Sequence, residues 1–85
     1  MKADKNVVNQ YLKTAKGQLE GVLRMVEEDA YCVDISNQLL AVRSLIDKAN
    51  RVIIEAHVKG CVRDAIEQNG GEEKIQELMN LISRL

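Results

Sequence analysis

The stretch VDISNQLLAVRSLIDKANRVIIEAHVK (33–59) decides the fold, because it contains neither glycine nor proline and nothing in it interrupts a helix. Its apolar residues recur every three or four positions, which is the period of an amphipathic α-helix. We therefore expect one long helix over about residues 31–68. The apolar stripe is broad, which indicates burial against more than one partner. Its members are Ile35, Leu39, Val42, Leu45, Ile46, Ala49, Val52, Ile53 and Ala56, with Leu40 and Ile54 at its margins.

A first helix is expected over roughly residues 5–28, where apolar residues have the same spacing. EEDAYC (27–32) interrupts this pattern, so we place a turn there and expect Asp29 to cap the helix that follows. Gly17 lies inside the first helix and costs about 1 kcal/mol relative to alanine. Its presence suggests the close approach of another backbone. The apolar residues of this helix are Val8, Leu12, Ala15, Leu19, Val22, Leu23 and Val26.

A third, short helix is expected at the end of the chain. Asn69-Gly70-Gly71 is a strong signal for the end of the long helix. Glu72 and Glu73 suit the positive end of a new helix. The sequence thus predicts an all-α fold of three helices with a long central one. The apolar face of the third helix consists of Ile75, Leu78, Met79, Ile82 and Leu85.

Composition limits the possible functions of this chain. Its 85 residues predict a single domain, residues 1–85, small enough that oligomerisation or metal often supports its stability. Tryptophan and phenylalanine are absent, which removes the stacking platforms typical of single-stranded nucleic-acid binders. No apolar run is long enough to span a membrane, and MKADKNVV (1–8) lacks the apolar stretch of a signal peptide. We therefore expect a cytoplasmic protein with reduced thiols and no membrane partner. The net charge of −1 does not exclude DNA binding, because bases can gather on one surface.

The candidate metal ligands are the only histidine, His57, and the two cysteines, Cys32 and Cys61. His57 and Cys61 lie one helical turn apart. If Cys32 belongs to the same helix, it lies about 37 Å from His57 at 1.5 Å per residue, so one chain cannot assemble the three ligands. Two such helices packed antiparallel would bring Cys32 of one chain beside His57 and Cys61 of the other, with two identical sites per pair. The same pairing would cover the broad apolar stripe.

One imidazole and two thiolates form a soft donor set. Cu(I) is the natural occupant, because thiolates select soft ions and Cu(I) accepts two or three ligands. Nickel would require more nitrogen ligands, whereas cobalt or zinc would need a water or carboxylate to complete the shell. The alternative is that the cysteines are buried, inert apolar residues and that the histidine only satisfies a local hydrogen bond.

The residues YC (31–32), His57 and Cys61 resemble those of the copper-sensitive operon repressors, in the spacing typical of the Cu(I)-sensing members. The wider family includes nickel/cobalt-, formaldehyde- and persulfide-responsive repressors. The resemblance covers almost the whole chain, including GQLEGVLRMVEEDAYCVDI (17–35) and HVKGC (57–61). It implies an all-helical dimer of dimers that represses genes for metal efflux or detoxification and loses affinity for double-stranded operator DNA when its inducer binds.

The resemblance also implies roles for individual residues. Cys32 of one protomer and His57 and Cys61 of another would bind Cu(I), with Tyr31 and Glu77 around them. Glu77 would accept a hydrogen bond from the free ring nitrogen of His57. The first helix carries fewer bases than is common in the family, with Glu20 and Tyr11 near positions where bases are expected. The remaining candidates for DNA contact are Lys13, Lys16, Gln18, Arg24, Arg43, Lys48 and Arg51.

Two alternatives to a Cu(I)-responsive repressor remain open. Cys32 and Cys61 could react with a persulfide or an electrophile in a repressor of the same fold. The chain could also be a copper-binding protein that never touches DNA, given its modest basic set. We expect neither an enzyme nor a small-molecule substrate, because no combination of nucleophile and base is visible.

Overall fold

The computed structural model describes residues 1–68 and 71–85, and three helices account for most of them: α1 (Lys5–Glu27), α2 (Cys32–Gln68) and α3 (Glu72–Ile82). The described residues contain no strand. The predicted all-α class, with three helices and a long central one, is confirmed. Of the predicted end signal for the long helix, Asn69 and Gly70 lie outside the described residues, while Gly71 directly precedes α3.

The turn between α1 and α2 differs from the expected one. Asp29 does not cap α2; it follows α1 with a left-handed backbone (φ 53°). The amide of Asp29 donates to the carbonyl of Val26, and the amide of Ala30 donates to that of Met25. This pair of bonds is the Schellman arrangement that satisfies the last carbonyls of a helix, with Asp29 where glycine is usual. The chain therefore reverses direction without a glycine.

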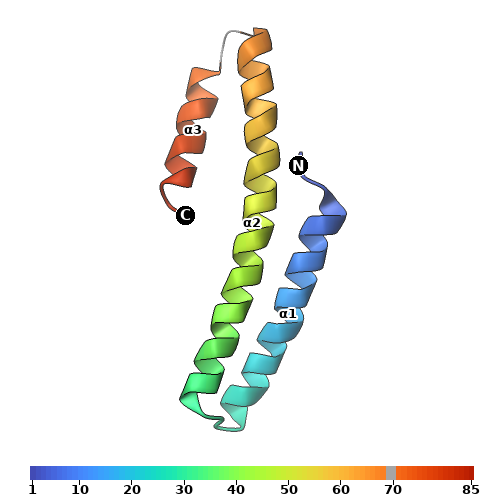
Figure 1. Ribbon diagram of the computed structural model, residues 1–85, viewed down its shortest axis with the longest axis vertical. Coiled ribbons are helices and arrows are strands. Elements are labelled where there is room, and N and C mark those ends of the chain that lie inside the picture. The colour runs from blue at the N-terminus through green and yellow to red at the C-terminus, as the bar shows by residue number, and fades with distance from the viewer. Residues whose placement is uncertain (69–70) are drawn as a thin grey trace.

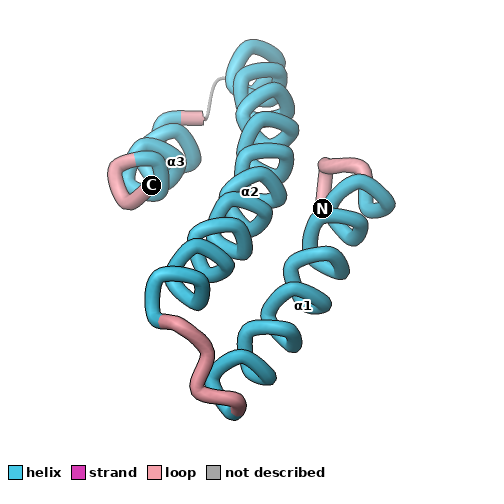
Figure 2. The backbone as a smooth tube through the Cα atoms, turned by 60° about the horizontal axis from the view of Figure 1, so that its bottom comes forward, coloured by secondary structure: helices cyan, strands magenta, loops and turns pink. Residues whose placement is uncertain are grey.

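The helices lie in a flat, elongated arrangement of 57 × 26 × 13 Å. The 37 residues of α2 form a rod of about 55 Å. Helix α1 runs antiparallel to the first half of α2, and α3 folds back along its second half (Figures 1 and 2). Within the described residues, α1 and α3 do not touch each other, since each packs only on α2. None of these helices combines the length and apolar character that a bilayer span requires.

The core of a single chain is thin. Val8, Ala15 and Val22, spaced seven residues apart on α1, are each 4% exposed, and Ala15 and Val22 cluster with Val42 of α2. Gly17 has no atom of a neighbouring segment within 4 Å of the position a Cβ would take, so the close approach expected there does not occur within residues 1–68 and 71–85. Only part of the apolar face of α1 is therefore covered by α2. The apolar residues of α1 that remain exposed are Val7, Leu12, Leu19, Leu23 and Val26.

The predicted stripe on α2 is also only partly covered. Val42 and Ala49 are buried, but Leu39, Leu40 and Ile46 remain 45%, 56% and 49% exposed. Monomeric soluble proteins rarely leave large contiguous apolar surfaces in water. The fold thus positions α2 with one face against α1 and another apolar face free.

Candidate metal centre

His57 and Cys61 lie on consecutive turns near the C-terminal end of α2. The side chain of Cys61 is 3% exposed, whereas His57 is exposed. Both border a cavity of about 240 Å³ whose walls come from the N-terminal segment, α2 and α3. One histidine and one thiol therefore face a shared space that could receive a soft metal ion. The lining residues are Lys2, His57, Cys61, Asp64, Lys74 and Glu77.

Cys32 lies at the other end of α2, as its first residue, and is exposed. Because α2 is continuous between them, Cys32 and His57 are separated by about 37 Å along the helix axis. Among residues 1–68 and 71–85, no group of three or more His, Cys, Asp or Glu side chains is close enough to hold a metal ion. The structure thus brings His57 and Cys61 together and leaves Cys32 remote, so a single chain does not unite the three predicted ligands.

The two residues expected around the ligands occupy opposite ends of the molecule. Glu77 of α3 lines the cavity with His57, although the described side chains show no hydrogen bond between them. Tyr31 precedes Cys32 and is 67% exposed, so its ring is free in the single chain. Each therefore lies near the half of the ligand set to which it was expected to belong.

Three further residues line the cavity and were not predicted from the sequence: Lys2, Asp64 and Lys74. The Lys2 ammonium lies 3.5 Å from Oδ2 of Asp64, with both side chains about half exposed. Asp64 could have been found by its spacing, since it lies seven residues after His57 and so shares its face of α2. Lys2 could not, because the pair joins residues 62 positions apart. With Lys74 and Glu77, the cavity carries two ammonium and two carboxylate groups.

The predicted DNA-contacting residues are spread over α1 and α2. All of them are exposed except Gln18, which is half-buried. Its Oε1 is buried and has no hydrogen-bond partner among the described residues. It therefore faces the packed side of α1. The exposed bases are Lys13, Lys16 and Arg24 on α1 and Arg43, Lys48 and Arg51 on α2.

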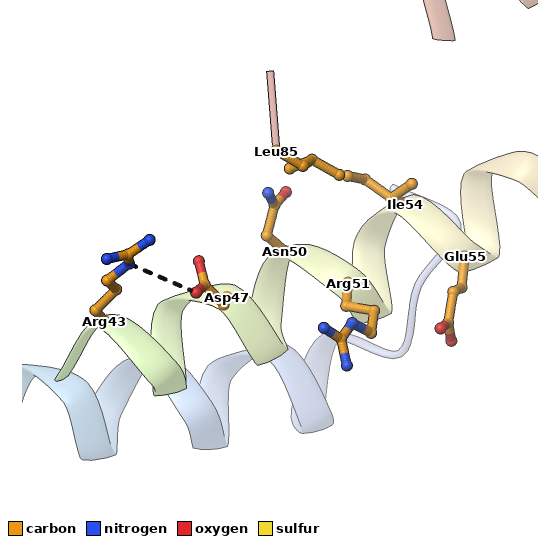
Figure 3. A pocket seen from close by; sticks show the side chains of 7 residues that line it. All are labelled: Arg43, Asp47, Asn50, Arg51, Ile54, Glu55 and Leu85. Atoms are coloured by element: carbon orange, nitrogen blue, oxygen red, sulfur yellow. Dashed lines mark ion pairs between the residues drawn. The ribbon is translucent and has the colours of Figure 1, made fainter. Parts of the chain in front are cut away.

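Arg43 and Arg51 line a second cavity, where the end of the chain returns to α2 (Figure 3). Leu85 lies over Ile54 there, and Nε of Arg43 is 4.0 Å from Oδ2 of Asp47, one helical turn away. An exposed ion pair of this kind contributes little and is easily exchanged for another anion. Arg43 is therefore available to a phosphate.

The family of metal-sensitive transcriptional repressors has a sequence model that matches residues 4–84, almost the whole length described above. The chain belongs to this family. Among its curated members, the copper-sensing transcriptional repressor CsoR of Mycobacterium ulcerans is 45% identical over 71 residues, which cover 84% of this chain and 61% of that protein. CsoR of Bacillus subtilis is 37% identical over 81 residues, covering 95% of this chain and 80% of the relative. The chain thus spans about three fifths of the mycobacterial repressor.

Solved structures of the metal-sensitive repressors share the arrangement of α1, α2 and α3. The copper-sensing repressor CsoR with Cu(I) from Geobacillus thermodenitrificans superposes with a TM-score of 0.82 at 35% identity, covering 91% of this chain and 80% of that one. The nickel-responsive regulator InrS gives a TM-score of 0.84 at 26% identity, covering 99% and 94%. The fold therefore occurs both in a copper-sensing repressor and in a nickel-responsive transcriptional regulator.

Proposed function

We propose that this chain is a cytoplasmic Cu(I)-responsive transcriptional repressor. In its metal-free form it binds double-stranded operator DNA, and Cu(I) releases it, so that genes for copper efflux and homeostasis are expressed. The observation that carries the proposal is the division of the ligands along α2: His57 and Cys61 share a cavity at one end, and an exposed Cys32 lies at the other. Curated relatives named as copper-sensing repressors support the same reading.

The complete site requires a second copy of the chain. Two α2 helices packed antiparallel bring Cys32 of each protomer to the His57–Cys61 turn of the other, with the two-fold axis near residue 46, midway between them. Leu39 and Ile46 follow Cys32 at intervals of seven residues, so they lie on the same face, and each is nearly half exposed. Pairing along this face removes both from water. Two such dimers would form the tetramer typical of the family.

The donor set fits Cu(I). Cys32 and Cys61 would provide thiolate sulfurs, and His57 would provide one ring nitrogen. When bound, Cu(I) would supply a soft centre that accepts three such ligands without demanding a fourth. The set lacks the further nitrogens that nickel favours. His57 is the only histidine of the sequence, so one chain offers a single imidazole.

Helix α3 offers a route from the site to the rest of the molecule. Glu77 and His57 border the same cavity, and we propose that the ring N–H that is not used for ligation donates to the Glu77 carboxylate once the metal is bound. A ring that gives one nitrogen to a cation donates more strongly through the other. Within residues 1–68 and 71–85, α3 packs only on α2. A hydrogen bond formed at Glu77 would therefore draw α3 toward α2 and shift the assembly away from its DNA-binding form.

The DNA contacts would be made by the exposed bases of α1 and α2, which meet phosphates rather than base edges. A tetramer repeats each base four times, so a modest set per chain can form an extended positive surface. Gln18 differs from these residues, because its amide oxygen is buried. For Gln18 we propose a role at the joint between helices instead of a direct phosphate contact.

The deciding experiment is a titration of the protein onto the promoter fragment of its own gene, with and without Cu(I), under anaerobic reducing conditions. We expect one Cu(I) per chain and loss of the DNA complex when it binds. His57→Ala should retain DNA binding and lose most of the copper response. Tight copper binding with unchanged DNA affinity would reject regulation, and failure to shift any promoter fragment at low salt would favour a copper-binding protein without a DNA role. A low-molecular-weight persulfide can transfer its outer sulfur to one cysteine, and attack by the second thiol then releases sulfide and leaves a disulfide. Crosslinking of Cys32 to Cys61 by such a persulfide, without a copper response, would favour a persulfide-responsive repressor.

A further inference from the structure

The N-terminal segment, residues 1–4, lies beside α2 (Figure 1), and its Lys2 lines the cavity of His57 and Cys61. Its Lys2 side chain reaches Asp64, and the two form an ion pair of 3.5 Å between residues 62 positions apart. This is a tertiary contact made by residues that precede the first helix. The segment is therefore held against α2, with its end beside the middle of that helix (Figure 1).

The stem of Lys2 lies directly on Gly60. A Cβ built on Gly60 would collide with Cδ, Cε and Nζ of Lys2, so a larger residue at this position would displace the end of the Lys2 side chain. His57, Gly60, Cys61 and Asp64 are spaced by three, four and seven residues and share one face of α2. Lys2 therefore lies across the face that presents both candidate ligands, and it forms part of the wall of their cavity.

We propose that Lys2 is a positioning residue of the metal centre: docked on Gly60 and tied to Asp64, it closes the open side of the cavity and controls access to Cys61. The near-complete burial of Cys61 in a single chain is consistent with such a cover. Control of Cu(I) entry by Lys2 rests on the proposed function, whereas the covering of Cys61 by Lys2 is a property of the metal-free chain.

The Lys2–Asp64 ion pair is weak enough for the cover to open and close. The two side chains are 50% and 43% exposed, and exposed ion pairs contribute at most about 1 kcal/mol. Breaking the pair should therefore raise the open fraction, and with it the reactivity of Cys61, roughly two- to fivefold. A stronger tie would hinder entry of the metal and of the partner's Cys32.

The test is the rate at which iodoacetamide alkylates Cys61 in the metal-free full-length protein, measured by mass spectrometry with Cys32 as the internal reference. Lys2→Gln should accelerate the reaction roughly two- to fivefold, and Lys2→Arg should restore the slower rate. Lys74→Gln is the matched control, because it removes the same charge from the same cavity, while Lys74 makes no ion pair within the described part of the chain. The reagent is uncharged, so electrostatic attraction of the reagent plays no part.

Two simpler explanations of a changed alkylation rate are a changed charge near the thiol and global unfolding. The direction of the rate change distinguishes the first from a cover, and Gly60→Ala distinguishes the second. Loss of a positive charge disfavours a thiolate and would slow alkylation, whereas loss of a cover speeds it. Gly60→Ala should also accelerate alkylation by displacing the Lys2 stem, although alanine favours a helix over glycine and should raise the free energy of unfolding by about 1 kcal/mol. Faster labelling in a more stable protein excludes global unfolding as the cause.

Unchanged or slower alkylation in Lys2→Gln would overturn the inference, as would equal acceleration in Lys74→Gln. These results do not depend on copper. If Lys2→Gln accelerates alkylation but the wild-type chain binds no Cu(I), the cover stands and the proposed function fails. If alkylation is unaffected while Cu(I) still releases the protein from DNA, only the cover fails.

Discussion

Replacement of Ile46 by alanine tests the pairing on which the complete metal site depends. Ile46 lies fourteen residues after Cys32 on the free face of α2 and is 49% exposed in the single chain. Full burial of an isoleucine side chain contributes about 1.5–3 kcal/mol, so covering the remaining half is worth about 0.7–1.5 kcal/mol. The two-fold axis of the proposed dimer would place two copies in the interface, which doubles the effect to about 1.5–3 kcal/mol per dimer.

We therefore expect Ile46→Ala to weaken dimerisation by one to two orders of magnitude, since about 1.4 kcal/mol corresponds to a factor of ten. Sedimentation equilibrium over a range of protein concentrations measures this constant. Ile66→Ala is the matched control: Ile66 belongs to the same helix and is 78% exposed, but its position in the helical repeat lies away from the stripe of Cys32, Leu39 and Ile46. It should leave the constant unchanged.

Copper binding provides a second measurement on the same variants. At protein concentrations where Ile46→Ala is mostly monomeric, Cu(I) affinity should fall, because Cys32 no longer meets the cavity of another chain. If Ile46→Ala dimerised normally while Ile66→Ala did not, the helices would pair through a different face. The interchain metal site would then be wrong.

Three further predictions concern single positions. Gly17→Ala should raise the free energy of unfolding by about 1 kcal/mol, because no other segment of the described chain lies within 4 Å of the new methyl group. Chemical denaturation measures this change, and a loss of stability would reveal close contact with another chain. The Glu77→Gln variant should bind Cu(I) with the same stoichiometry but need more copper to release DNA, because a neutral amide is a weaker acceptor for the His57 N–H than a carboxylate. An unaltered copper response would show that Glu77 does not link Cu(I) binding to DNA release. Lys16→Gln should weaken operator and unrelated DNA equally and reduce the salt dependence of binding; loss of affinity for the operator alone would instead indicate a base contact.

The helices could be predicted from the sequence because their signals are local. A stretch without glycine or proline at 33–59 and an apolar period of three to four residues are sufficient for α2, whatever it packs against. The turn at Asp29 could not be predicted in the same way. Asp29 adopts a left-handed backbone, which its residue type alone does not predict. Because aspartate is also a common N-cap, the sequence favoured that role instead.

The candidate site was predictable only in part. His57 and Cys61 were brought together by their spacing along one helix, and the length of that helix separates Cys32 from them. Lys2 and the buried oxygen of Gln18 depend on contacts between distant segments, for which periodicity carries no information. Gln18 was predicted as a candidate for DNA contact, but its amide oxygen is buried.

The continuous α2 has a consequence for mixed assemblies. In the proposed dimer each chain would contribute a sulfur to one centre and an imidazole with a sulfur to the other, so substitutions at opposite ends of α2 would complement each other. A chain lacking Cys32 and a chain lacking His57 would each form homodimers without an intact centre. Mixed together, they would form heterodimers with one fully functional centre and one doubly defective centre, and half of the copper capacity per heterodimer would return.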